Sequence, residues 1–145
     1  MMQNTINLIS LLNEGKIIQI KPQGYSMYPM FVPGRDSAII KKANTNMLKR
    51  GDVVLYRREG SILVLHRICK RCENEIYLVG DNQVKIEGPV RIEQVEGILI
   101  AFIHKGKKIS VRNPFYQLLS HMWLIARPYR QGMKQFAVKI KKYLQ

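Results

Sequence analysis

Short runs of strand-forming residues recur along this chain, and turn-forming residues separate them. The runs lie at Lys16–Ile20, Ser37–Lys42, Val53–Arg58, Ile62–Ile68, Glu75–Val79 and Gly97–Ile103, with clusters of Gly, Pro and Asn between them. Spacing of this kind is typical of antiparallel sheets that coil on themselves. The sequence therefore predicts a mainly β fold, a coiled antiparallel sheet or partial barrel. Its 145 residues suit one domain with a hydrophobic core.

Helical periodicity is found near the two ends of the chain. A short leading helix is expected at Thr5–Asn13, where apolar residues recur every three residues and Gly15 follows as a stop signal. Near the C-terminus, apolar residues recur at helical spacing before and after Pro128, which is expected to break the helix. They are Phe115, Leu118, Leu119, Met122, Trp123 and Ala126 before it, and Met133, Phe136, Ala137, Ile140 and Leu144 after it. The sequence thus predicts a domain over residues 1–112 and a basic amphipathic helical tail over residues 113–145.

The charge of the chain is distributed unevenly. No Asp or Glu follows Glu96, whereas residues 105–145 contain ten Lys or Arg, and the formal net charge is +14. Basic amphipathic helices suit an anionic membrane, where burial of apolar area and attraction of lysines act together. The tail is expected either to bind such a membrane surface or to cover the sheet and expose a solvated basic face. Its polar side would carry Lys134, Lys139, Lys141 and Lys142.

A serine and a histidine lie in segments that suit nucleophilic catalysis. A serine hydroxyl must pass its proton to a base during attack. Ser26 lies in Gly24-Tyr25-Ser26-Met27-Tyr28-Pro29, where the glycine allows close backbone approach and the proline stiffens the turn. His66 lies in an apolar strand-like run, and an imidazole with an ordinary pKa of about 6.5 can act as a base at neutral pH. Taken separately, these would be an ordinary turn serine and an ordinary core histidine.

Taken in order along the chain, these segments resemble the motifs of the signal peptidase and SOS-repressor superfamily of serine proteases. The resemblance covers roughly residues 13–105. Its motifs are Glu14-Gly15-Lys16, the serine segment, Pro33-Gly34-Arg35-Asp36, Arg50-Gly51-Asp52-Val53-Val54, His66-Arg67-Ile68 and Gly80-Asp81-Asn82. Members of the superfamily place either a lysine or a histidine at the position of His66, so the chain resembles the Ser-His branch. The resemblance implies a serine endopeptidase related to signal peptidases, with residues 1–112 as the peptidase domain.

The same resemblance implies roles for single residues. Ser26 would be the nucleophile, and His66 would remove its proton and later protonate the leaving amine. The acid that orients the imidazole would be Glu87 by alignment with the Ser-His branch, with Asp81 as the competing carboxylate. In family members the position of Asp81 often forms a structural ion pair, for which Arg67 is the expected partner. The expected oxyanion donor is the backbone N–H of Ser26.

Other features of the sequence narrow the function class. Cys69 and Cys72 lack a second pair of ligands and a thioredoxin-like context, so both are interpreted as strand or hairpin residues. The sequence predicts no metal or organic cofactor. The alternatives to an active protease are an inactive relative that binds peptide or membrane, and a DNA-linked self-cleaving regulator. The regulator is disfavoured because only 23 residues precede Gly24, so nucleic acid is not an expected partner.

The sequence also bears on where the protein acts. No segment approaches the roughly 20 consecutive apolar residues of a membrane span. Residues 1–15 lack the positive start and the cleavage site of a secretory signal. The expectation is a cytoplasmic protein, with peripheral attachment to the inner membrane surface as an alternative. Its expected substrate is a peptide or protein precursor, such as the leader of a small modified peptide.

Overall fold

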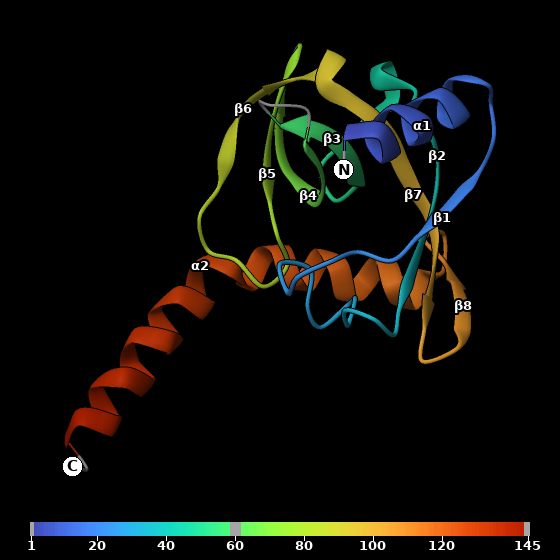
Figure 1. Cartoon of the computed structure of the whole chain (residues 1–145). Helices are drawn as coiled ribbons and strands as arrows, with labels where there is room; N and C mark the ends of the chain where they lie inside the picture. Colours follow the sequence, from blue (N-terminus) through green and yellow to red (C-terminus); the bar gives the residue numbers. More distant parts are fainter. Residues whose placement is uncertain (1, 59–61, 144–145) are drawn as a thin grey trace.

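The fold is mainly β, with an antiparallel sheet curled into a half-barrel, a short N-terminal helix and a C-terminal helix (Figure 1). The computed structural model describes residues 2–58 and 62–143, and the side chains of residues 2–6, 130–140 and 143 lie outside that description. The helices are α1 (Met2–Asn13) and α2 (Pro114–Tyr143). The strands are β1 (Ile18–Ile20), β2 (Ser37–Lys42), β3 (Val53–Arg58), β4 (Ile62–Cys72), β5 (Glu75–Val79), β6 (Glu87–Arg91), β7 (Val95–His104) and β8 (Lys107–Ser110). Short 3-10 helices lie at Thr45–Met47 and Ile92–Gln94.

The sheet has a single antiparallel path. Its strand order is β1-β2-β7-β3-β4-β5-β6, and β8 pairs with β7 beside this path. Register shifts interrupt the pairing at Ile39/Ile40, Leu55/Tyr56, Ile68/Lys70 and Ile76/Leu78. Because such irregularities bend a strand and increase its twist, four of them along the path favour a curled sheet over a flat one.

The prediction of a coiled antiparallel sheet is confirmed. The sequence predicts β2, β3 and β5 with their observed bounds, and β1, β4, β7 and α1 with shifted ends. It misses β6 and β8. Gly88-Pro89 inside β6 is a dipeptide typical of turns, but a proline is tolerated there because β6 lies at the end of the strand order. Strand β8 is four residues long and starts with two lysines, so it lacks the apolar pattern that predicts a strand.

Buried side chains form two clusters, one on each face of β4. Neighbouring residues of a strand point to opposite faces of the sheet. Leu65 packs in the cluster that also contains the buried residues of the serine segment and of α1. Ile68 packs in the other cluster, which is built from β3, β5 and β6. The alternation therefore places Arg67 on the face of Leu65, and His66 on the face of Ile68.

Helix α2 begins with a capped turn on the body of the protein and ends away from it (Figure 1). The Asn113 side-chain oxygen accepts hydrogen bonds from the amides of Phe115 and Tyr116 at 2.9 and 3.3 Å, as an N-cap residue does. Further along, Leu124 is buried against the body. Neither helix, over the residues described, combines the length and the apolar character needed to cross a membrane.

The predicted break at Pro128 is wrong, because α2 continues through this residue. A proline inside a helix removes one hydrogen bond, here the bond to the carbonyl of Leu124, and its ring crowds that carbonyl. The rest of the helical ladder remains on both sides, and contacts with the body hold the preceding turns. The apolar residues predicted after Pro128, Met133, Phe136, Ala137, Ile140 and Leu144, lie outside the described side chains.

Candidate active site

The serine segment, residues 24–31, is a compact turn that two buried side chains anchor. The amide of Tyr28 donates to the carbonyl of Tyr25 at 3.1 Å, and the amide of Phe31 donates to that of Met27 at 3.0 Å. Met27 and Phe31 are 2% and 1% exposed. Ser26, which lies between these anchored residues, is therefore held on a fixed backbone although its own side chain is partly exposed.

This turn rests against the Gly80–Asn82 turn, more than fifty residues further along the chain. The carbonyl of Ser26 accepts a hydrogen bond from the amide of Asn82 at 2.9 Å. A Cβ atom on Gly80 would lie 2.5 Å from the same carbonyl oxygen, which is closer than real Cβ contacts allow. A glycine is therefore required at position 80 for the serine turn to approach this closely.

The register of β4 and β5 relates this contact to His66. Ile68 pairs with Leu78, and Arg67 pairs with Val79. The strand pairing ends there, and Gly80 follows the last residue of β5; continuing the register by one step would set Gly80 opposite His66. Residues directly opposite each other in an antiparallel pair share a face of the sheet, so the Ser26 carbonyl fills the space that a side chain at position 80 would occupy on the face of His66.

His66 is buried, at 3% exposed, and belongs to a chain of hydrogen bonds. Its Nδ1 atom lies 3.2 Å from the hydroxyl of Tyr56, which donates its proton to Glu87 at 2.5 Å. The carboxylate of Glu87 also lies 3.9 Å from Nδ1. Because the Tyr56 proton is directed to Glu87, the hydroxyl oxygen accepts from His66, and Nδ1 carries the ring proton. Nε2 then has the free lone pair that a general base requires.

The charges around His66 keep each group in the protonation state that this chain of hydrogen bonds needs. Hydrogen bonds from Arg58, at 2.8 and 2.7 Å, lower the pKa of Glu87, so its carboxylate stays ionised. Burial raises the pKa of Tyr56, and the hydrogen bond to Glu87 raises it further. Burial lowers the pKa of His66, and the charge of Glu87 opposes this only in part. His66 is therefore neutral at neutral pH.

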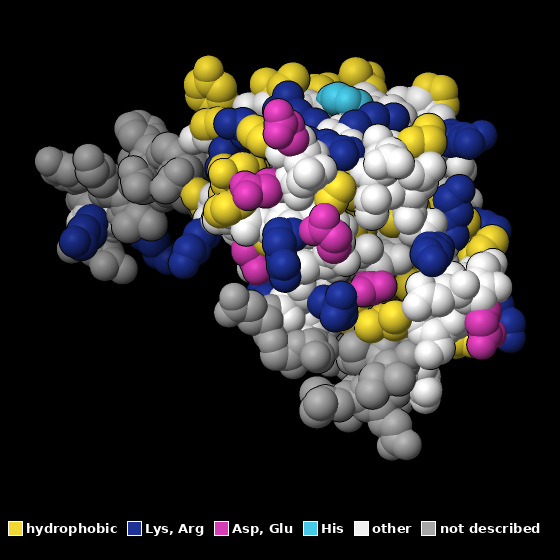
Figure 2. Space-filling view, turned by 90° about the horizontal axis from the view of Figure 1, so that it is seen from above, with side chains coloured by type: hydrophobic (Ala, Val, Ile, Leu, Met, Phe, Trp, Pro, Cys, Tyr) yellow, Lys and Arg dark blue, Asp and Glu magenta, His cyan; other side chains and the backbone are white. Residues whose placement is uncertain are grey.

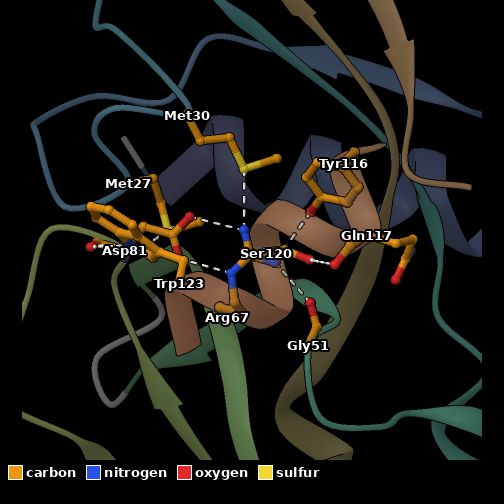
Figure 3. A network of polar contacts seen from close by, with 9 residues as sticks. All are labelled: Met27, Met30, Gly51, Arg67, Asp81, Tyr116, Gln117, Ser120 and Trp123. Atoms are coloured by element: carbon orange, nitrogen blue, oxygen red, sulfur yellow. Dashed lines mark hydrogen bonds and ion pairs between the residues drawn. The ribbon is translucent and has the colours of Figure 1, made fainter. Parts of the chain in front are cut away.

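The competing carboxylate, Asp81, is held in a separate network on the other face of β4 (Figure 3). Nε and Nη2 of Arg67 each donate to one oxygen of Asp81 at 2.8 Å. Nη1 donates to the carbonyl of Gly51 and to the hydroxyl of Tyr116, and Nη2 donates to the sulfur of Met30. All five N–H groups of a guanidinium that is 1% exposed thus have partners. The expected Arg67–Asp81 ion pair is confirmed.

The same network fixes the Gly80–Asn82 turn to α2 and to the serine segment. The indole N–H of Trp123 donates to the carbonyl of Asp81 at 2.7 Å. The amide of Asp81 donates to the sulfur of Met27 at 3.4 Å. Asp81 therefore positions the turn on which Ser26 rests, whereas Glu87 is the carboxylate linked to the ring of His66.

The structure brings the predicted site residues together only in part. Glu87 and His66 are connected through Tyr56, whereas Ser26 rests on the Gly80–Asn82 turn. Over the residues that the structure describes, neither the hydroxyl nor the amide of Ser26 has a hydrogen-bond partner, so Ser26 is not bonded to His66. An open cavity of about 520 Å³, lined by Arg58 and residues 83–87, lies beside the carboxylate of Glu87.

The sequence did not identify Tyr56 and Arg58 as site residues. Both lie on β3, where Tyr56 is paired with Val64 and thus diagonal to His66. The continuous apolar run at the start of β3 could have suggested that Tyr56 is buried. The pairing register was needed to show that its hydroxyl meets a histidine ten residues further on.

The two cysteines lie in β4, as predicted for strand residues. Both are free thiols, and the Cys69 thiol donates to the carbonyl of Tyr77 at 3.3 Å. Among the residues described, no group of three or more His, Cys, Asp or Glu side chains could hold a metal ion.

We expect Asp81→Asn to destabilise the fold strongly. The substitution leaves Arg67 buried without its counter-charge, which typically costs about 3–5 kcal/mol. Glu96→Gln is the matched control, because Glu96 pairs with Arg57 at the surface, where an ion pair contributes about 1 kcal/mol or less. Denaturant unfolding measures both free energies, and equal losses for the two variants would contradict the structural role of Asp81.

We expect Gly80→Ala to displace the serine turn. Its methyl group would collide with the Ser26 carbonyl, and overpacking of this kind costs about 1–3 kcal/mol. The control is Gly106→Ala in the β7–β8 turn. The added Cβ meets nothing within 4 Å there, so the only cost is the strain of an alanine at a φ of +80°. In ¹⁵N-labelled protein, only Gly80→Ala should shift the amide resonances of residues 25–28 and of Asn82. Unshifted resonances would show that the two turns do not meet.

Comparisons with known proteins leave the chain without an assigned family. No protein-family model matches it, and no curated protein matches it. The candidate site is thus defined by its geometry: a serine turn seated on Gly80, and a neutral histidine that Tyr56 and Glu87 orient.

Proposed function

We propose that this protein is a serine endopeptidase that cleaves a peptide or protein precursor through an acyl-enzyme on Ser26. The proposal rests on two observations: the Ser26 carbonyl is seated on Gly80, and His66 has its Nδ1 engaged by Tyr56 while its Nε2 has no hydrogen-bond partner among the described residues. The resemblance of the motifs to signal peptidase-like enzymes supports the same function.

In the proposed reaction, the neutral Nε2 of His66 takes the proton of the Ser26 hydroxyl as its oxygen attacks the substrate carbonyl. The imidazolium then gives this proton to the leaving amine, and water hydrolyses the acyl-enzyme by the same route. Glu87 acts as a positioning residue, because its negative charge reaches the imidazolium through Tyr56. The amide of Ser26, which has no partner among the described residues, would donate to the oxyanion.

The reaction requires the Ser26 hydroxyl to approach Nε2 when substrate binds. Hydrogen bonds of catalytic groups are often long or unformed in a free enzyme and tighten in its substrate complex. Because the backbone of Ser26 is already seated, rotation of one side-chain torsion supplies much of this adjustment. An extended substrate strand would lie beside the serine turn, as in other peptide-binding sites that use main-chain pairing.

The inactive relative remains the second candidate, and the unbonded Ser26 hydroxyl is the observation that favours it. Such a protein would bind peptide at the same turn without cutting it. Cleavage, rather than binding, therefore decides between the two candidates.

We expect Ser26→Ala to abolish proteolysis while leaving the fold intact, because the side chain makes no hydrogen bond that the fold needs. Mass spectrometry of new protein N-termini compares cells that express the wild type or the variant at equal levels. Termini that disappear with the variant would identify both the activity and the substrate. Identical sets of termini would contradict the proposed protease and favour the binding-only candidate.

We expect activity to fall on the acid side as His66 becomes protonated, with a midpoint below the ordinary histidine pKa of about 6.5, because burial lowers the pKa of His66. The charge of Glu87 raises that pKa, so Glu87→Gln should move the midpoint to still lower pH. The variant should also reduce kcat by about tenfold or more, because the imidazolium loses its counter-charge.

NMR titration of the His66 ring gives the same pKa without a substrate, and a pH–rate profile follows once a cleaved peptide is known. Glu96→Gln is the control, because it removes a carboxylate from the neighbouring Arg57 ion pair instead of the Arg58 pair. A His66 pKa that rises or stays constant in Glu87→Gln would show that Glu87 does not act on the imidazole.

A further inference from the structure

Helix α2 carries a stripe of exposed apolar side chains along the face that points away from the sheet. Each member of this stripe is between 49% and 74% exposed. The stripe consists of Phe115, Leu118, Leu119, Met122, Ile125 and Tyr129. Their spacing of three or four residues places them on one side of the helix. A row of large apolar groups in water is costly, and such a surface marks an interaction site.

The opposite side of α2 is the one that packs on the body of the protein. Leu124 and Ser120 are buried there, Trp123 is bonded to Asp81, and Arg127 donates to the carbonyl of Val84 at 3.2 Å. The sheet therefore uses a different set of α2 residues, and the stripe is left without a partner from the described part of the chain.

Helix α2 continues through Pro128. The sequence has further apolar residues beyond it, at Met133, Phe136, Ala137 and Ile140, whose side chains lie outside the described part of the structure. The stripe is therefore defined by the residues from Phe115 to Tyr129 alone.

The charge of this region indicates what the stripe contacts. No Asp or Glu occurs after Glu96, so the charged residues of α2, of β8 and of the turn before β8 are all cations. Exposed examples are Lys105, Lys107 and Lys108 of the hairpin, and Lys141 and Lys142 of the last turn of α2. Figure 2 shows Lys and Arg side chains spread among hydrophobic ones over another face as well. A second copy of this chain would bring two surfaces of net charge +14 together, which like-charge repulsion opposes.

We propose that α2 docks on the surface of an anionic lipid bilayer, with the stripe buried at the boundary between headgroups and acyl chains. Helix α2 has 30 residues, and its second half bends away from the direction of the first and extends beyond the sheet (Figure 1). A planar partner can cover the stripe on the first half. Burial of the stripe and attraction of the surrounding cations to anionic lipid then act together.

Docking in this way brings the serine segment close to the lipid. An apolar cavity of about 580 Å³ has Phe115 and Leu119 of the stripe in its wall, together with Pro29 and Met30 of the serine segment. Membrane docking does not depend on catalysis, so it stands or falls separately from the proposed protease activity.

The test is flotation of the full-length protein with lipid vesicles. One set of vesicles contains phosphatidylcholine alone, and the other contains equal parts of phosphatidylcholine and phosphatidylglycerol. We expect binding to the anionic vesicles only, and weaker binding as the salt concentration rises. The double variant Leu118→Asn/Met122→Asn keeps the charge but removes two apolar anchors, so its vesicle affinity should fall by about tenfold or more. Ser26→Ala should bind as the wild type does.

The control is Met47→Asn, because Met47 is 73% exposed on the first 3-10 helix and belongs to no such stripe. It should bind vesicles as the wild type does. Unfolding curves show whether each variant is folded. Because the substituted side chains are exposed, we expect every variant to fold. Three results would overturn the proposal: no flotation with anionic vesicles, equal affinity for the double variant and the wild type, or dimers in analytical ultracentrifugation that the double variant abolishes.

Discussion

The ion pair between Arg67 and Asp81 is the interaction on which the rest of this structure depends. It is buried, and each remaining N–H of Arg67 is used by a different segment: the turn before β3 through Gly51, α2 through Tyr116, and the serine segment through Met30. A buried guanidinium without partners would cost several kcal/mol, so these segments are held where its hydrogen bonds require them. The Gly80–Asn82 turn, and hence the seat of Ser26, follows from that requirement.

The site arises because two consecutive residues of β4 point in opposite directions. Arg67 organises one face, while His66 on the other face meets Tyr56 and Glu87. The separation favours Glu87 over Asp81 as the carboxylate that would orient the imidazole in the proposed reaction. Asp81 is fully engaged by a permanent cation and shapes the turn, whereas Glu87 is linked to the ring whose charge would change in the proposed reaction. The absence of a side chain at Gly80 admits the Ser26 carbonyl to the turn that Asp81 positions.

In helix α2, the continuity of the backbone through Pro128 decides how the apolar residues of the C-terminal region are arranged. Divided at Pro128, its apolar residues would form two short amphipathic helices, each free to pack in its own direction. As one helix, it presents one face to the sheet and a long apolar stripe to the surroundings. The loss of a single hydrogen bond at a proline is tolerated because contacts of Leu124, Trp123 and Arg127 already hold the preceding turns on the body.

The sequence by itself determined six of the eight strands, the leading helix, the basic C-terminal region and the pairing of Arg67 with Asp81. These depend on local periodicity or on the resemblance of short motifs. It could not predict β6, because Gly88-Pro89 is typical of turns and only an edge position accommodates it. It could not predict the role of Tyr56, because cross-strand register decides which side chains meet. Only the tertiary structure placed Ser26 on Gly80, since that contact joins segments that no local pattern relates and that meet where Asp81 holds the turn against Arg67, Trp123 and Met27.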